Sequence, residues 1–184
     1  MTQVEVVGPG PGGPCALEDF RDDARALTDE AFAARHGRAF FLHHGALGDL
    51  RPARRGQPTV LVDGEPPAAG AVRLDFLVFP IRTSSKTNSP GFVSIGRTEN
   101  NDIVINDVSV SKFHAFCRLN GDGSVVILDS GSSNGTFVND IAVPRHGSGE
   151  PVHLSTGDTV RLGTVRLSFL PHAAFRNMVV QLGG

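Results

Sequence analysis

The chain has 184 residues and a formal net charge of −2 at pH 7. This length suits one domain with a substantial extension, or two small units. The small net charge gives no general attraction to nucleic acids or to anionic membranes, although a local basic patch is compatible with it.

Two short helices are predicted after a glycine- and proline-rich segment, residues 1–14, which we expect to be a flexible tail. Thr28 is typical of an N-cap and Gly37 of a helix end, so the second helix should lie between them. Helices this short cannot bury their apolar faces alone, and we expect both to pack on the rest of the chain. The first helix has apolar residues at steps of three and four, which places them on one face: Leu17, Phe20, Ala24 and Leu27.

Two short candidate strands follow, at residues 39–43 and 59–62, and residues 63–70 have the composition of a linker. His43 and His44 have no third ligand at a useful spacing, so they do not indicate a metal site. The connection between the two strands is basic, and we interpret it as a solvated loop rather than a phosphate site. Its basic residues are Arg51, Arg54 and Arg55.

From residue 72 onward, short apolar runs alternate with turn signals and show no helical pattern. Many short strands at short spacing favour an all-β sandwich. Pro171 should end the last strand, and residues 173–182 are compatible with a short C-terminal helix. The predicted strands are residues 72–79, 92–95, 103–105, 115–119, 125–128, 136–138, 159–162 and 165–169.

The two cysteines, Cys15 and Cys117, lack the spacing of metal ligands, and a disulfide framework is not expected. Cys117 falls in an alternating apolar run, which predicts a small buried side chain. The first residues show no signal-peptide pattern, and no apolar run approaches membrane-spanning length. We therefore expect a cytoplasmic protein with no metal, no cofactor and no membrane insertion.

Three polar clusters follow successive predicted strands: Gly96-Arg97, Ser111-Lys112-Phe113-His114 and Ser133-Asn134-Gly135-Thr136. A phosphate dianion is held best by charge-assisted donors such as a guanidinium fork, hydroxyl groups and an ammonium. Arg97 offers the fork, Ser111 and Ser133 offer hydroxyls, and Lys112 offers a point charge. Asn134 can bond through both ends of its amide, which suits the backbone of an extended peptide.

These motifs, in this order on an all-β pattern, resemble the forkhead-associated (FHA) domain over about residues 72–170. The family signature is Gly-Arg, then Ser-Arg-x-His, then Ser/Thr-x-Asn-Gly. The resemblance implies an FHA-like β-sandwich of about 10–11 strands whose loops bind phosphothreonine peptides. Arg97 and Ser111 would contact the phosphate, Ser133 would support them, and Asn134 would hold the peptide backbone. Lys112 stands where the signature often has arginine, so it keeps the charge but loses the fork.

Further roles also come from the resemblance alone. Ser109 lies where family members tend to read a ligand side chain beyond the phosphothreonine. Gly96, His114 and Gly135 would shape the loops, and Asn139 would help to order the turn that follows it.

We therefore predict a flexible tail over residues 1–14, a helical/β extension over 15–70 that packs on the sandwich, an FHA domain over 71–171, and a tail or short helix over 172–184. The protein would be a phosphothreonine-peptide-binding adaptor or regulator in Ser/Thr kinase signalling. Its partner would be a phosphothreonine-containing protein or a Ser/Thr kinase, and it would bind no nucleic acid and catalyse no reaction.

Three alternatives stay open at this point. The chain could be a phospho-independent scaffold or an assembly subunit of a larger complex. An enzyme would depend on Ser111 and His114, but no acidic third member lies in a recognisable motif. A phosphorylated threonine of the extension could dock on its own domain or on a neighbour; Thr28 is a candidate, although a role as helix N-cap already explains this residue.

Overall fold

The computed structural model describes residues 12–44, 76–83 and 91–182. Several sequence predictions lie outside these residues: the tail up to residue 11, the strand at 59–62, the linker at 63–70, and the start of the strand at 72–79. The basic loop that contains Arg51, Arg54 and Arg55 also lies outside them.

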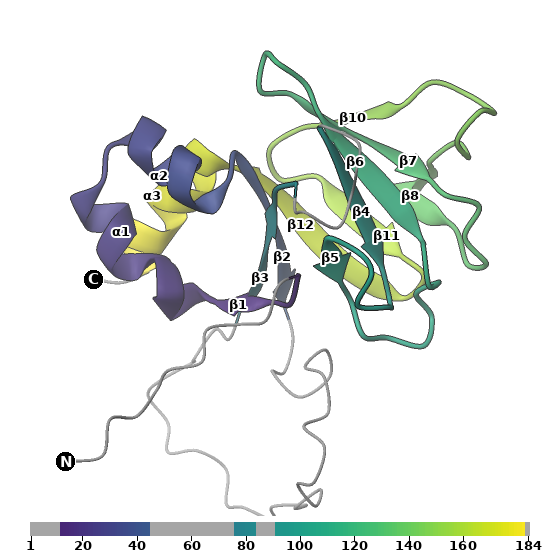
Figure 1. The fold of residues 1–184 in the computed structure, drawn as a ribbon, viewed down its shortest axis with the longest axis horizontal. Helices are drawn as coiled ribbons and strands as arrows, with labels where there is room; N and C mark the ends of the chain where they lie inside the picture. The colour runs from purple at the N-terminus through teal and green to yellow at the C-terminus, as the bar shows by residue number, and fades with distance from the viewer. Residues whose placement is uncertain (1–11, 45–75, 84–90, 183–184) are drawn as a thin grey trace, which may run out of the picture.

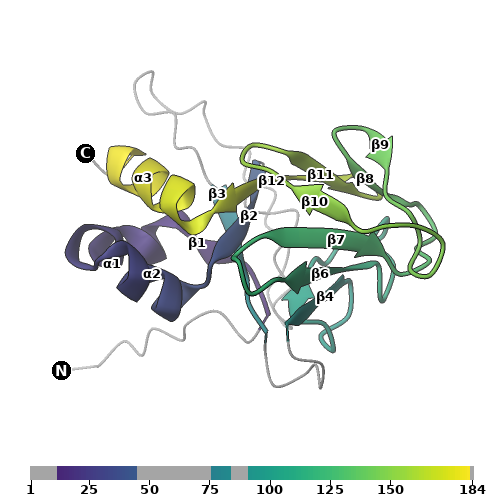
Figure 2. The ribbon, with the colours of Figure 1, turned by 90° about the horizontal axis from the view of Figure 1, so that it is seen from above.

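The described strands form two sheets that pack face to face, which confirms the predicted all-β sandwich (Figures 1 and 2). Neighbouring strands are antiparallel throughout, except that β4 and β5 are parallel. The seven-stranded sheet has the order β1 (Cys15–Ala16), β3 (Phe76–Ile81), β2 (Ala39–His44), β12 (Val165–Pro171), β11 (Thr159–Leu162), β8 (Thr136–Val138) and β9 (Ile141–Ala142). The five-stranded sheet has the order β10 (Val152–Leu154), β7 (Val125–Asp129), β6 (Ala115–Leu119), β4 (Phe92–Gly96) and β5 (Ile103–Val104).

The main hydrophobic core lies between the two sheets. Ile127 and Cys117 from the five-stranded sheet meet Phe41 and Val160 from the seven-stranded sheet, and all four are fully buried. The predicted burial of Cys117 is thereby confirmed, and burial raises the pKa of its thiol above the ordinary value. This core holds the strand ends, and therefore the loops between them, in fixed positions.

A second core lies on the opposite face of β2 and β3, beneath a layer of helices (Figure 2). Successive side chains of a strand point to opposite faces, so Phe40 of β2 faces the helices while Phe41 faces the sandwich. The Phe40 ring stacks on Phe175 with 4.1 Å between ring centroids, and Phe20 meets Phe175 edge-on. The layer consists of the 3₁₀ turn η1 (Leu17–Phe20) and helices α1 (Arg21–Ala26), α2 (Asp29–His36) and α3 (His172–Leu182).

Both predicted N-terminal helices are present, although the first begins as the 3₁₀ turn η1, and the predicted ends of the second are confirmed. The Thr28 hydroxyl accepts a hydrogen bond from the Ala31 N–H at 3.3 Å, which makes Thr28 the N-cap of α2. Gly37 ends this helix with φ +116°, a conformation that side chains rarely allow. The predicted C-terminal helix is α3, and the strand before it ends at Pro171 as expected. No helix among the described residues is long and apolar enough to cross a bilayer.

Strand β2 lies inside the seven-stranded sheet, between β12 and β3. Leu42 pairs with Ser168 on one side and with Val78 on the other. The segment before residue 70 therefore contributes an internal strand as well as helices. The division into an extension over 15–70 and a domain over 71–171 stays a prediction.

Candidate functional site

An open pocket of about 450 Å³ lies where three loops meet at one end of the sandwich. Gly96 at the end of β4, Ala115 at the start of β6 and Asp129 at the end of β7 bring these loops together, because antiparallel neighbours place those ends side by side. The loops are the β4–β5 loop (residues 97–102), the β5–β6 loop (105–114) and the β7–β8 loop (130–135). All five predicted ligand contacts and the predicted specificity residue line the pocket: Arg97, Ser111, Lys112, Ser133, Asn134 and Ser109.

Arg97 is held from two sides by the β5–β6 loop. Its backbone N–H donates to the Ser111 carbonyl at 3.0 Å, and its Nε donates to the Val110 carbonyl at 3.2 Å. These two bonds fix the guanidinium beside the pocket. The two terminal nitrogens are then the donors with which Arg97 can hold an anion.

Gly96 is needed because two backbones approach each other closely behind the pocket. A Cβ atom at this position would lie 2.2 Å from the Lys112 carbonyl oxygen and 2.8 Å from Asn101 Nδ2. Asn101 is fully buried, and its amide donates to the Lys112 carbonyl at 2.7 Å and to the Thr98 carbonyl at 2.8 Å. Asn101 therefore joins the β4–β5 loop to the β5–β6 loop, a role that the sequence analysis did not assign.

His114 ties the β5–β6 loop to the β7–β8 loop. Its Nδ1 accepts the Ser111 backbone N–H at 3.0 Å, so its Nε2 carries the hydrogen and donates to the Gly135 carbonyl at 3.1 Å. Burial lowers the pKa of His114 below 6.5, although the Gly135 carbonyl and the nearby Asp129 carboxylate oppose this effect. The ring contacts the backbone of Ser111 and not its hydroxyl, so this arrangement gives Ser111 no general base from His114.

The Ser111 hydroxyl is oriented by the neighbouring loop. Ser111 Oγ accepts the backbone N–H of Ser133 at 3.0 Å. A hydroxyl that accepts one hydrogen bond still has its own hydrogen to donate. Ser111 can therefore present an O–H to an anion in the pocket, beside the guanidinium of Arg97.

Asn134 is positioned by hydrogen bonds that run through Ser109 to the turn between β11 and β12. Its Nδ2 donates to the Ser109 carbonyl at 2.8 Å, which leaves its Oδ1 to accept an N–H from an extended peptide. The Ser109 hydroxyl in turn donates to Asp107 at 2.6 Å and accepts the Thr164 N–H at 3.0 Å. A Cβ at Gly163 would lie 2.4 Å from the Ser109 carbonyl oxygen, so glycine permits this approach. Neither Asp107 nor Thr164 was predicted from the sequence.

The buried carboxylate of Asp129 organises the β7–β8 loop. It accepts the backbone N–H groups of Gly131 and Ser132 at 2.7 and 2.9 Å, and the hydroxyls of Ser132 and Thr136 at 2.6 and 2.7 Å. Burial alone would raise the pKa of Asp129, but these four hydrogen bonds hold it below its ordinary value. An aspartate two residues before Gly131-Ser132-Ser133 is typical of an Asx turn, but Asp129 was not predicted as a site residue.

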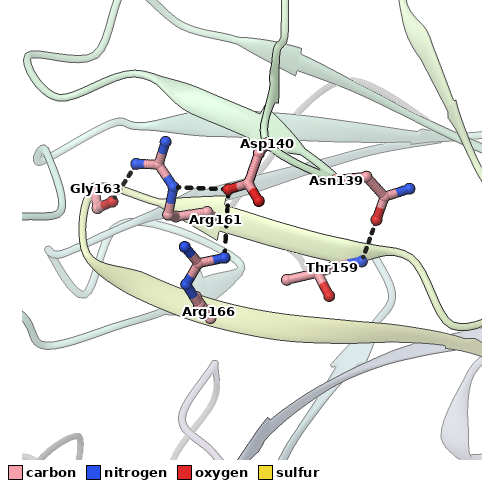
Figure 3. A network of polar contacts seen from close by, with 6 residues as sticks. All are labelled: Asn139, Asp140, Thr159, Arg161, Gly163 and Arg166. Atoms are coloured by element: carbon pink, nitrogen blue, oxygen red, sulfur yellow. Dashed lines mark hydrogen bonds and ion pairs between the residues drawn. The ribbon is translucent and has the colours of Figure 1, made fainter.

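Asn139 is not among the residues that line the pocket, and its side chain bonds the segment at the start of β11 (Figure 3). Its Nδ2 donates to the Asp158 carboxylate at 2.8 Å, and its Oδ1 accepts the Thr159 N–H at 3.0 Å. Next to it, the Asp140 carboxylate lies 3.8 Å from Arg161 Nε, and Arg161 donates to the Gly163 carbonyl at 2.9 Å. These contacts connect the turn after β8 to the glycine that supports Ser109.

The described residues contain no group of three or more histidine, cysteine or acidic side chains that could hold a metal ion. His43 Nδ1 instead lies 3.1 Å from the Arg166 carbonyl oxygen. The residues that line the pocket offer hydrogen-bond donors, a guanidinium and an ammonium, which suit an anionic ligand.

Comparisons with known proteins identify similar sequences. The FHA domain family model matches residues 93–163. The glycogen accumulation regulator GarA of Mycobacterium tuberculosis is 36% identical over 124 residues, which cover 65% of this chain and 69% of GarA. The oxoglutarate dehydrogenase inhibitor of Corynebacterium jeikeium is 45% identical over 75 residues, which cover 41% of this chain, and the chain spans about half the length of that relative (47%). A structure from a study of phosphothreonine-dependent FHA domain interactions is 21% identical, covers 71% of this chain and 94% of that chain, and superposes with a TM-score of 0.43.

Proposed function

The chain belongs to the FHA domain family, and from this premise we propose that it is a regulator that binds phosphothreonine peptides. The observation that carries the proposal is the pocket in which Arg97, Ser111, Lys112 and Asn134 converge from three loops. Two relatives support a regulatory role through their names, a glycogen accumulation regulator and an oxoglutarate dehydrogenase inhibitor. Binding alone, without a catalysed reaction, would be sufficient for this role.

In the proposed mechanism, the phosphate is held by charge-assisted hydrogen bonds. A phosphothreonine carries a charge of about −1.5 to −2 near neutral pH and has three strong acceptor oxygens. The Arg97 terminal nitrogens and the Ser111 hydroxyl would donate to these oxygens, while Lys112 adds positive charge and the Ser133 hydroxyl supports them. The Nε contact of Arg97 with Val110 and the contact of Ser111 with Ser133 hold both side chains through the protein itself, so little ordering entropy would be lost on binding.

Asn134 would hold the peptide backbone beside the phosphothreonine through its Oδ1. Ser109 would lie next to a ligand side chain farther along the peptide. Gly96, His114, Gly135 and Asn139 would act indirectly by holding the loops and turns in place. We propose that the partner is a phosphothreonine-containing protein or a Ser/Thr kinase, and that the chain acts as an adaptor in kinase signalling.

The test is binding of a degenerate phosphothreonine peptide library, and then of a selected peptide, to the wild type and to Arg97→Ala. We expect Arg97→Ala to weaken binding about 10- to 100-fold, because hydrogen bonds to charged groups contribute about 1.5–3 kcal/mol. Arg118→Ala is a matched control, because it also removes one guanidinium but lies toward the opposite end of β6 from the pocket. It should leave binding unchanged.

Two results would overturn the proposal. One is retention of the unphosphorylated peptide as tightly as of the phosphorylated one, which would favour a phospho-independent scaffold. The other is equal retention of phosphopeptides by the wild type and by Arg97→Ala.

A further inference from the structure

The pocket has an apolar rim, formed by Val108 and Phe113, from which we infer that the ligand carries a bulky apolar side chain close to its phosphothreonine. This inference rests on the proposed function, because it names the class of peptide that the same site would select. It adds a feature that neither the polar contacts nor the predicted specificity residue Ser109 supplies.

Exposed bulky apolar side chains are few among the described residues, and two of them gather at the pocket. Val108 is 91% exposed and Phe113 is 56% exposed, and both belong to the β5–β6 loop. The other large exposed apolar residues lie elsewhere, on β9 and on α3: Ile141, Val180 and Leu182. Both side chains line the pocket beside its polar residues, so a ligand bound there can cover them.

The exposure of the rim follows from the way in which the β5–β6 loop is anchored. Val110, between the two rim residues, is 1% exposed, and its N–H donates to the Asp107 carbonyl at 3.1 Å. His114, directly after Phe113, is fully buried, and its N–H donates to the Ile95 carbonyl at 2.8 Å. The loop is therefore fixed at both anchors, and Val108 and Phe113 are left at the surface of a defined structure.

The rim residues flank the polar contacts along the same loop. Ser109, Ser111 and Lys112 lie between Val108 and Phe113 in the sequence, and all of them line the pocket. A peptide whose phosphate reaches Ser111 and Arg97 would therefore occupy the same pocket that Val108 and Phe113 line. Burying an apolar ligand side chain there removes apolar surface of both molecules from water, which is favourable.

The charges at the pocket are consistent with this ligand. Among the described residues, its lining contains Arg97 and Lys112 and no carboxylate, and the nearby Asp107 carboxylate already accepts the N–H and hydroxyl of Ser109. The phosphate would neutralise the positive charge at the centre. The rest of the described lining is uncharged and includes the apolar rim beside polar residues such as Ser109 and Asn134.

The first experiment applies a degenerate phosphothreonine library to the full chain, as wild type, Val108→Ser, Phe113→Ser and Ile141→Ser. We expect the wild type to enrich Leu, Ile, Met or Phe at one or more positions near the phosphothreonine. Val108→Ser or Phe113→Ser should lose that enrichment while still retaining phosphopeptides. Ile141→Ser is the matched control, because Ile141 is 73% exposed but lies on β9 outside the pocket, and it should behave as the wild type.

A second measurement uses two peptides that differ only at the enriched position, one with the selected apolar residue and one with alanine. The wild type should bind the apolar peptide about 10-fold more tightly, as expected for burying one large apolar side chain. In the variant that loses enrichment, the two affinities should become nearly equal. Continued binding of the alanine peptide shows that the variant is folded and that its phosphate contacts are intact.

The outcomes separate the two proposals. If Arg97→Ala abolishes retention but the wild type enriches no apolar residue, or enriches acidic residues instead, the proposed function stands and the apolar rim does not select the ligand. The same conclusion follows if both rim variants keep the wild-type enrichment. If Arg97→Ala retains phosphopeptides as well as the wild type does, the proposed function itself fails, and the inference fails with it.

Discussion

At the scale of single residues, His114 is the position where a proton would weaken the site. Its Nδ1 accepts the Ser111 N–H, and this contact is possible only while that nitrogen is unprotonated. The side chain is buried, and its neutral form holds two pocket loops together. Acidification should therefore lower the stability of the fold and disturb the geometry of the two loops, both through protonation of His114.

The folded chain keeps the pKa of His114 below 6.5, whereas the unfolded chain has the ordinary value. Between these two values the unfolded state binds more protons, so the free energy of unfolding should rise with pH up to about 6.5 and fall below it. We predict that His114→Gln reduces this pH dependence relative to the wild type. Urea unfolding of both proteins from about pH 5 to pH 7 measures the difference. Parallel pH profiles for the two proteins would contradict the assignment.

The polar contacts that hold the site show why its residues were only partly predictable from the sequence. Arg97, Ser111 and Asn134 stand in local motifs, so they could be chosen before the fold was known. Thr164 lies 55 residues from Ser109 in the sequence and reaches it only through the fold. No local pattern of residue types marks such a contact.

At the scale of elements, the β7–β8 loop depends on the carboxylate of Asp129 at the end of β7. We predict that Asp129→Asn lowers the free energy of unfolding by about 2–3 kcal/mol, because one of two acceptor oxygens is replaced by a donor facing buried donors. The affinity for a phosphothreonine peptide should fall as well, since Ser133 and Asn134 lie on this loop. Urea unfolding and peptide titration measure the two effects.

Asp122→Asn is the control for this substitution. Asp122 likewise accepts a backbone N–H and a hydroxyl, both from Ser124, but it lies in the exposed turn between β6 and β7. Its replacement should change stability much less and should leave peptide affinity unchanged. Equal effects of the two substitutions would show that Asp129 has no special part in the pocket.

Alternation of apolar residues predicted the strands that cross the sandwich, and turn residues marked most of their ends. The strands that escaped prediction are β1, β9 and β10, which have only two or three residues each. Both residues of β9 are exposed, so no buried face produces an alternating pattern there. These short strands pair because the longer strands bring them together in space. A short stretch of sequence carries no information about that placement.

At the scale of the whole molecule, the two cores share strands β2 and β3 and should therefore unfold together. We predict that Phe175→Ala lowers the free energy of unfolding by about 3–5 kcal/mol, because Phe175 is fully buried against Phe40 and Phe20. The chain has no Trp or Tyr, so far-ultraviolet circular dichroism and amide hydrogen exchange are the suitable probes.

Hydrogen exchange of amides in β6 and β7 tests the coupling, because these strands belong to the main core and do not touch Phe175. Their protection should fall together with that of α3. Val180→Ala on the same helix is the control, since Val180 is 40% exposed and should cost far less stability. Loss of protection confined to the helices would mean that the two cores unfold separately.

The position of β2 also has a consequence for the order in which the molecule is made. Leu42 of β2 pairs with Ser168 of β12. The internal strand β2 therefore cannot pair on this side until β12, more than a hundred residues later in the chain, has been synthesised. During translation, β2 and β3 would carry an unpaired edge and an apolar surface until β12 and α3 leave the ribosome. Contacts so far apart along the chain also slow folding. The pocket loops precede β12 and α3 in the sequence, so the nascent protein should become competent to bind a ligand only after these two elements have been synthesised.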